Sequence, residues 1–355
     1  MLRFGVIAAA LLAAPLGAQT PRPDSSFAAT VARLSEPGGY FDTDNLVSNE
    51  RSYLHVMGPL RDLGVTSGAY LGVGPDQNFS YILAVRPALA LIIDIRRDNL
   101  LQQLLFKALF LRARNRLEYL CLLFGRPVPP DLATWDERPL DDLLRYVDET
   151  KPAGTVKVDV SSFGVPLDSA DRAKIAQMHA QFMHQGLELR LTTFNRPVRL
   201  DYPTYRDLLR ETDRDGRRAG YLVREADYRY LRQLQREHRI VPVVGNLAGT
   251  TAMSAIARFL TERGLVVAAF YTSNVEQYLL RDGGFPQFAR NVAALPAHPR
   301  SVIIRSYFPR GRPHPQQVAD YNTVQLLQRF STLVEAERRG GYTSYFDLVT
   351  RDVLP

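Results

Sequence analysis

The sequence predicts an α/β protein with a doubly wound, mostly parallel sheet and a largely helical insertion. Short, continuously apolar runs alternate with helix-like stretches before and after a long interruption. The runs are apolar enough to be strands that are covered on both faces. The chain has 355 residues, of which 46% are hydrophobic, so it can bury a sizeable core.

Residues 1–18 have the pattern of a secretory signal peptide. Arg3 precedes an apolar run from Phe4 to Leu16, and small residues come before Gln19. The pattern predicts an exported, periplasmic protein with no membrane span after signal removal. If residues 1–18 are retained, the alternative is a cytoplasmic protein.

Four further segments organise the chain. They are an N-terminal leader and helix over 19–65, the first half of the sheet domain over 66–125, a mostly helical insertion or cap over 126–238, and the second half of the sheet domain over 239–355. The leader up to residue 40 lacks periodicity, and a helix-like stretch runs from Asp42 to Leu63.

Within these segments, apolar periodicity predicts the individual elements. Strands are expected over 68–74, 89–95, 239–246, 265–274 and 301–307, with a strand-like stretch over 187–194. Helices are expected over 99–124, 140–149, 168–186, 203–212, 224–238, 250–263 and 315–340.

Composition argues against nucleic-acid binding and metal sites. The net charge of +7 is nearly all arginine, and the basic stretches 214–218 and 307–315 contain Gly or Pro, which is typical of solvated loops. The stretch 211–216 imitates half of a calcium loop but lacks the closing carboxylate. No Gly-x-Ser-x-Gly elbow is present, and Cys121 reads as a core thiol. We expect a small-molecule ligand, and the sequence leaves the oligomeric state open.

Small and polar residues collect where the predicted strands end. In a parallel sheet these ends meet at one edge, where ligands bind. Asp94 follows Gly74 by twenty residues, a spacing that suits hydrogen bonds to an adenosine ribose in a dinucleotide or in S-adenosylmethionine. Pro75 has no N–H for a pyrophosphate, so a ligand without phosphates is favoured. The candidate binding residues are Gly72, Gly74, Asp76, Gln77, Asp94, Arg96, Asn246 and Asn274.

A purely structural interpretation of the same residues stays open. Gly72 and Gly74 could serve only tight packing of strand against helix, and Asp94 could cap the following helix. Asn49, Glu50 and Tyr53 either close the pocket or form an ordinary helix face, and the pattern favours the helix face.

The chain resembles an uncharacterised bacterial family with a class I S-adenosylmethionine-dependent methyltransferase-like, Rossmann-like fold. The resemblance rests on "YLGVGPDQNFSYI" (70–82), "IIDIRRDNLLQQLLFKALF" (92–110), "VVGNLAG" (243–249) and "FYTSNVEQYL" (270–279), with "SNERSYLHV" (48–56) before them. It covers most of the chain after residue 18. Tyr70 stands where such proteins carry an acidic residue before the first glycine, and Gln77 replaces the third glycine.

The resemblance implies S-adenosylmethionine as cofactor and methyl transfer as the reaction, with an unknown acceptor. Asp94 would hold the ribose, and Asn246 or Asn274 would bind the amino-acid moiety or the acceptor. The expected catalytic residues are Glu276 as the base and Tyr271 as a wall or hydrogen-bond partner.

The predicted export of the chain argues against this activity, because S-adenosylmethionine is made in the cytoplasm. The alternative is an exported, catalytically silent Rossmann-like protein that binds a nucleoside-like small ligand or an envelope partner. If the protein binds an envelope partner, the insertion over 126–238 would be the contact surface.

Overall fold

One six-stranded sheet forms the centre of the protein. The computed structural model describes residues 26–154 and 156–354. The strand order is β3-β2-β1-β4-β5-β6, with β1 to β5 parallel and β6 antiparallel to β5. The predicted α/β class with a mostly parallel sheet is therefore confirmed. The strands are β1 (Ala69–Gly72), β2 (Leu89–Asp94), β3 (Ile240–Val244), β4 (Val267–Ser273), β5 (Ala297–Tyr307) and β6 (Val324–Arg329).

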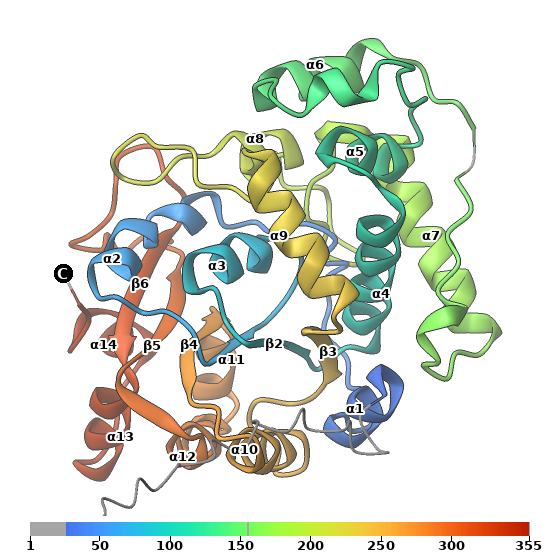
Figure 1. Cartoon of the computed structure of the whole chain (residues 1–355). Coiled ribbons are helices and arrows are strands. Elements are labelled where there is room, and N and C mark those ends of the chain that lie inside the picture. Colours follow the sequence, from blue (N-terminus) through green and yellow to red (C-terminus); the bar gives the residue numbers. More distant parts are fainter. Residues whose placement is uncertain (1–25, 155, 355) are drawn as a thin grey trace, which may run out of the picture.

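Helices cover both faces of this sheet (Figure 1). In that view α3, α4 and α9 lie above the sheet, and α10, α12 and α13 lie below it. The helices are α1 (Phe27–Leu34), α2 (Met57–Asp62), α3 (Gln77–Val85), α4 (Arg97–Arg112), α5 (Arg116–Phe124), α6 (Leu140–Glu149), α7 (Ser169–Gln185), α8 (Tyr205–Arg210), α9 (Glu225–Arg236), α10 (Ala252–Glu262), α11 (Val275–Arg281), α12 (Phe285–Ala294), α13 (Phe330–Arg338) and α14 (Tyr345–Thr350). Short 3₁₀ helices span Arg51–Leu54, Leu132–Trp135, Ser161–Phe163 and Gly186–Glu188.

Two strands, β1 in the middle of the sheet and β3 at its edge, are buried along their whole length. Every residue of β1 and β3 is buried, which explains why their sequences are continuously apolar and do not alternate. The expected strand positions agree with the structure because this signal is local. The helices expected over 140–149, 168–186, 203–212 and 224–238 are present as α6, α7, α8 and α9.

Two predictions in the first 125 residues were wrong. The single helix expected over 99–124 is divided into α4 and α5, because the side chain of Asn115 accepts the backbone N–H of Glu118 and caps a new helix. The helix expected from Asp42 is absent over 42–50, which is non-helical, and α1 occupies part of the leader that appeared to lack periodicity.

The predicted helix over 315–340 was also wrong, because strand β6 occupies its middle. Gln325 and Gln328 lie in this strand, and both are buried. Gln325 donates to Glu50 and Gln328 accepts from Arg305, so both side chains have polar partners inside the protein. The strand-like stretch 187–194 contributes only an isolated bridge between Thr43 and Thr193, because no neighbouring strand lies beside it.

The predicted signal peptide, residues 1–18, lies outside the described residues. Within 26–154 and 156–354, no helix combines the length and the apolar character needed to cross a membrane.

Lys107 joins three helices in the interior. It belongs to α4, and its Nζ donates to the carbonyl of Gln235 in α9 and lies 4.5 Å from the centre of the Phe27 ring in α1. The residue is only 1% exposed, and burial lowers the pKa of Lys107 from 10.5 to about 7.

This lowered pKa predicts a stability that rises with pH. Between pH 7 and 10.5 the unfolded chain holds a proton on Lys107 that the folded chain releases, so raising the pH favours folding. We expect the free energy of unfolding to rise by about 2 kcal/mol or more from pH 7 to 9.5, before tyrosines titrate. Urea unfolding should show this rise in the wild type and a smaller one in Lys107→Met. An equal rise of the free energy of unfolding with pH in the two proteins would contradict the lowered pKa of Lys107.

Candidate ligand-binding site

A cavity of about 1540 Å³ lies at the carboxyl ends of β3, β2, β1 and β4. Between β1 and β4 the order of the strands reverses, and this is the place where open α/β sheets bind ligands. The lining comes from the segments after these strands (73–77, 93–96, 245–248 and 273–284), from the N-terminal segment 40–50, and from 191–202, 307–310 and 345–346.

Six of the ten predicted site residues line this cavity. They are Gly74, Gln77, Asp94, Arg96, Asn246 and Asn274. The other four are buried in the protein interior and are not among the lining residues. These are Gly72, Asp76, Tyr271 and Glu276.

Glu276 is part of a buried ion pair. Its side chain is 0% exposed, and its two carboxylate oxygens accept from Nε and Nη2 of Arg305 at 2.8 and 2.9 Å. Arg305 also donates to Gln328 on β6. The structure therefore corrects the prediction that Glu276 is a base in the pocket, because both of its oxygens face Arg305.

Tyr271 lies beneath the cavity and links two lining residues. Its hydroxyl donates to Oε2 of Glu50 at 2.6 Å and accepts from Nε2 of Gln77 at 3.1 Å. Burial and the neighbouring Glu50 raise the pKa of Tyr271 well above its usual value. The phenol therefore stays protonated and acts as a hydrogen-bond link. Of the two roles expected for Tyr271, a wall or a hydrogen-bond partner, its contacts fit the second, and it is not among the residues that line the cavity.

Asp76 connects the turn after β1 to the predicted insertion. Its Oδ2 accepts from the hydroxyls of Tyr205 at 2.5 Å and Tyr221 at 2.9 Å. Burial raises the pKa of Asp76. The carboxyl group fixes the position of 205–221 against α3, so its predicted role in binding a cofactor is corrected.

Position 72 requires glycine, because the side chain of Asn78 occupies the space that a Cβ would need. A Cβ at Gly72 would lie 1.9 Å from Oδ1 of Asn78 and 2.6 Å from the hydroxyl of Tyr70. Asn78 donates to the carbonyls of Val73 at 2.9 Å and Pro75 at 2.7 Å, and Tyr70 donates to Asn78 at 2.7 Å. Tyr70 and Asn78 thus order the glycine turn in place of the acidic residue that position 70 lacks.

Asp94 and Arg96 form a pair at the cavity wall. The Asp94 carboxylate accepts from the backbone N–H, Nε and Nη2 of Arg96 at 2.9, 3.1 and 2.9 Å. Arg96 also donates to the carbonyls of Thr43 and Asp44 at 3.1 Å. The pair therefore holds the N-terminal segment against the end of β2, and Asp94 is not the cap of α4 that the alternative interpretation expected.

The N-terminal segment contributes Glu50, whose place in the pocket the sequence pattern disfavoured. Glu50 is 1% exposed, lines the cavity and lies at the end of a non-helical segment. Its carboxylate accepts hydrogen bonds from four side chains, Tyr271, Ser273, Ser306 and Gln325. No local signal reveals this arrangement, because the partners lie more than two hundred residues away in the sequence.

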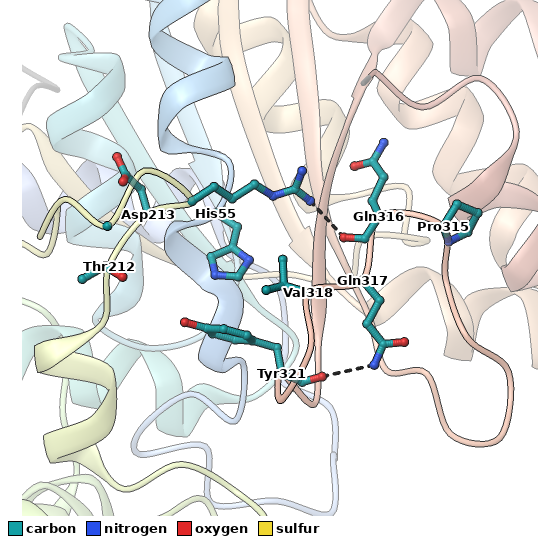
Figure 2. Close-up of a pocket in the computed structure, with 10 residues that line it drawn as sticks. His55, Thr212, Asp213, Pro315, Gln316, Gln317, Val318 and Tyr321 are labelled. Atoms are coloured by element: carbon teal, nitrogen blue, oxygen red, sulfur yellow. Dashed lines mark hydrogen bonds between the residues drawn. The ribbon is translucent and has the colours of Figure 1, made fainter.

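A second pocket of about 540 Å³ lies elsewhere, between the segments 212–216 and 315–321 (Figure 2). The His55 ring lies 4.4 Å from the Tyr321 ring, and Arg214 donates to the carbonyl of Gln316 at 3.0 Å. Burial lowers the pKa of His55 to about 4, so the imidazole is neutral at pH 7. This pocket joins two loops and includes none of the predicted site residues.

The described ranges contain no cluster of His, Cys, Asp and Glu side chains that could hold a metal ion. The calcium-like stretch 211–216 uses Asp213 to accept the backbone N–H groups of Asp215 and Arg217, and Asp213 also pairs with Arg61.

The chain belongs to the family described as a domain of unknown function, DUF7790. The family model matches residues 45–124 and 171–349, which include all six strands and most of the cavity wall. No curated protein matches the chain.

The packing at Gly72 predicts a specific loss of stability. Gly72→Ala forces Asn78 to move and opens its hydrogen bonds to the turn, so we expect a loss of about 3 kcal/mol in the free energy of unfolding. Gly58→Ala is the matched control, because the nearest atom to its added Cβ is 3.8 Å away, and its effect should stay within about 1 kcal/mol. Equal effects in urea unfolding would contradict the packing role.

The ion pair of Glu276 gives a second stability prediction. Glu276→Gln leaves the Arg305 guanidinium buried without a counter-charge, which should lower the free energy of unfolding by roughly 3 kcal/mol. Glu335→Gln breaks an exposed pair with Arg339 and should change it by less than about 1 kcal/mol. Denaturant titrations of the wild type and the two variants measure both changes in the free energy of unfolding. A neutral effect of Glu276→Gln would show that the pair is not the buried contact seen here.

Proposed function

We propose that the cavity binds S-adenosylmethionine and that the protein is an S-adenosylmethionine-dependent methyltransferase-like protein with a Rossmann-like fold. The observation that carries this proposal is the cavity at the reversal of strand order, where Gly74 after β1 and Asp94 at the end of β2 line the same space. The methyl acceptor is not assigned.

The residues present suit an adenosine ligand without phosphates. Gly74 has φ +82°, and its missing side chain leaves room beside Asn45 and Gln77. Asp94 Oδ2 accepts one hydrogen bond from Arg96, so this oxygen can accept a second from a ribose hydroxyl. Ile95 and Leu247 offer apolar surface for the adenine ring. Pro75 still provides no N–H for a pyrophosphate.

The size of the cavity favours a second molecule beside the cofactor. Small-molecule sites usually measure about 300–1,000 Å³, and this cavity is about 1540 Å³. A bound cofactor supplies a methyl group on a sulfonium, and the protein's contribution is to align an acceptor with it. The Nδ2 group of Asn246 is suited to bind cofactor or acceptor, because its Oδ1 is fixed by the backbone N–H of Ala248.

A specific observation favours a second candidate function, a catalytically silent protein that binds a nucleoside-like ligand. The two side chains expected to perform catalysis are both engaged in the interior, Glu276 by Arg305 and Tyr271 by Glu50. Such a protein would bind the ligand at the same strand ends without transferring a group.

Calorimetric titration of the purified protein with S-adenosylmethionine and S-adenosylhomocysteine tests the binding proposal. We expect micromolar affinity, and we expect Asp94→Asn to weaken it about tenfold or more through loss of the ribose contact. Asp62→Asn, on an exposed position of α2, should bind like the wild type.

Circular dichroism of each variant separates lost binding from lost folding, since Asp94→Asn also weakens the pair with Arg96. Absence of binding to folded wild-type protein would contradict the cofactor assignment. Binding of both nucleosides without methyl transfer to any added acceptor would favour the silent protein.

A further inference from the structure

Glu50 is a buried carboxylate without a cationic partner. Its four donors are neutral hydroxyl and amide groups, and no ion pair within residues 26–154 and 156–354 involves it. Buried charges in proteins are normally paired. Because Glu50 lines the cavity, a ligand could supply the missing positive charge from that side.

The two oxygens of Glu50 differ in their engagement. Oε2 accepts from Tyr271 at 2.6 Å, from Ser306 at 2.5 Å and from Gln325 at 3.0 Å. Among the described residues, Oε1 accepts only from the hydroxyl of Ser273, which also lines the cavity. Oε1 is therefore the oxygen with remaining capacity to accept a hydrogen bond from a ligand.

Gln77 places a second acceptor in the same wall. It is 7% exposed and lines the cavity, and its Oε1 has no hydrogen-bond partner. The orientation of the amide is fixed, because the Tyr271 hydroxyl gives its proton to Glu50 and can only accept from Nε2 of Gln77. The unpartnered atom is thus a buried acceptor, which a ligand donor or a water molecule would satisfy.

We propose that this wall of the cavity binds a primary ammonium group of the ligand, with Glu50 as its counter-charge and Gln77 Oε1 as a second acceptor. An ammonium has three donors and a positive charge, and it matches both groups. A carboxylate or phosphate in the place of the ammonium would be repelled by Glu50. For S-adenosylmethionine the bound group is the α-ammonium, and the α-carboxylate on the same carbon must point away from Glu50, so in this form the inference rests on the proposed function. The carboxylate that binds the ammonium group is then Glu50 of the N-terminal segment and not a residue at position 70 on β1.

The direct test compares two ligands that differ by the amino-acid moiety. S-adenosylhomocysteine carries the ammonium, and 5′-methylthioadenosine has the same nucleoside thioether without it. In calorimetric titrations, Glu50→Gln should weaken S-adenosylhomocysteine by about 10- to 100-fold and change 5′-methylthioadenosine by less than about twofold. Gln77→Met should weaken only S-adenosylhomocysteine, by about threefold to tenfold.

Gln77→Met also keeps the test decisive if Glu50→Gln does not fold. Asp94→Asn is the matched comparison, since the ribose contact is common to both ligands and both should weaken together. Equal weakening of the two ligands by the Glu50 and Gln77 variants, or no weakening by either variant, would overturn the ammonium site.

Failure of the wild type to bind either nucleoside would reject the proposed cofactor but not the ammonium site. The probes are then n-butylamine and n-butanol in thermal unfolding. The ammonium site predicts that the amine raises the melting temperature of the wild type more than the alcohol does, and that Gln77→Met and Glu50→Gln reduce this difference. No difference between amine and alcohol in the wild type would overturn it.

Discussion

The buried carboxylate of Glu50 holds the N-terminal segment on the second half of the sheet. Its donors come from β4, β5 and β6, so one side chain joins three strands. Arg96 fastens the same segment to the end of β2 through the carbonyls of Thr43 and Asp44. The wall formed by residues 43–50 is therefore attached to both halves of the sheet.

The turn after β1 is fixed independently of any ligand. Asn78 binds two carbonyls of the turn, and Asp76 binds two tyrosines from the predicted insertion. Side chains that are already ordered lose little conformational entropy when a ligand arrives, so a site of this kind is preorganised. Through these two tyrosines, the segment 205–221 packs against the turn after β1 and supports it.

Local signals in the sequence predicted much of the fold. The buried strands and the four helices of the insertion appear where apolar runs and helical periodicity place them. The failure over 315–340 concerns polar residues whose partners are distant in the sequence, whereas the division of the helix at Asn115 has a local cause. In the segment expected as a helix, the sequence does not show that Gln325 and Gln328 are buried beside Glu50 and Arg305.

The predictions of site residues divide in the same way: local patterns found some residues, and contacts distant in the sequence were missed. Gly74, Asp94, Asn246 and Asn274 were found because strand ends meet at one edge of a parallel sheet. Glu276 was assigned wrongly because the sequence does not show Arg305 beside it. The importance of Glu50 was underestimated because a helix was expected around it, whereas the chain there is non-helical and meets partners on β4, β5 and β6.

We propose that the strand-end cavity holds a nucleoside ligand with its ammonium group on Glu50. A crystal structure of the protein with S-adenosylhomocysteine would show this placement. We expect density for the ligand beyond β1 and β2, with the ribose at Asp94 and the amino group within hydrogen-bond distance of Glu50 and Gln77. Density in the pocket beside His55 and Tyr321, or an amino group directed away from Glu50, would contradict it.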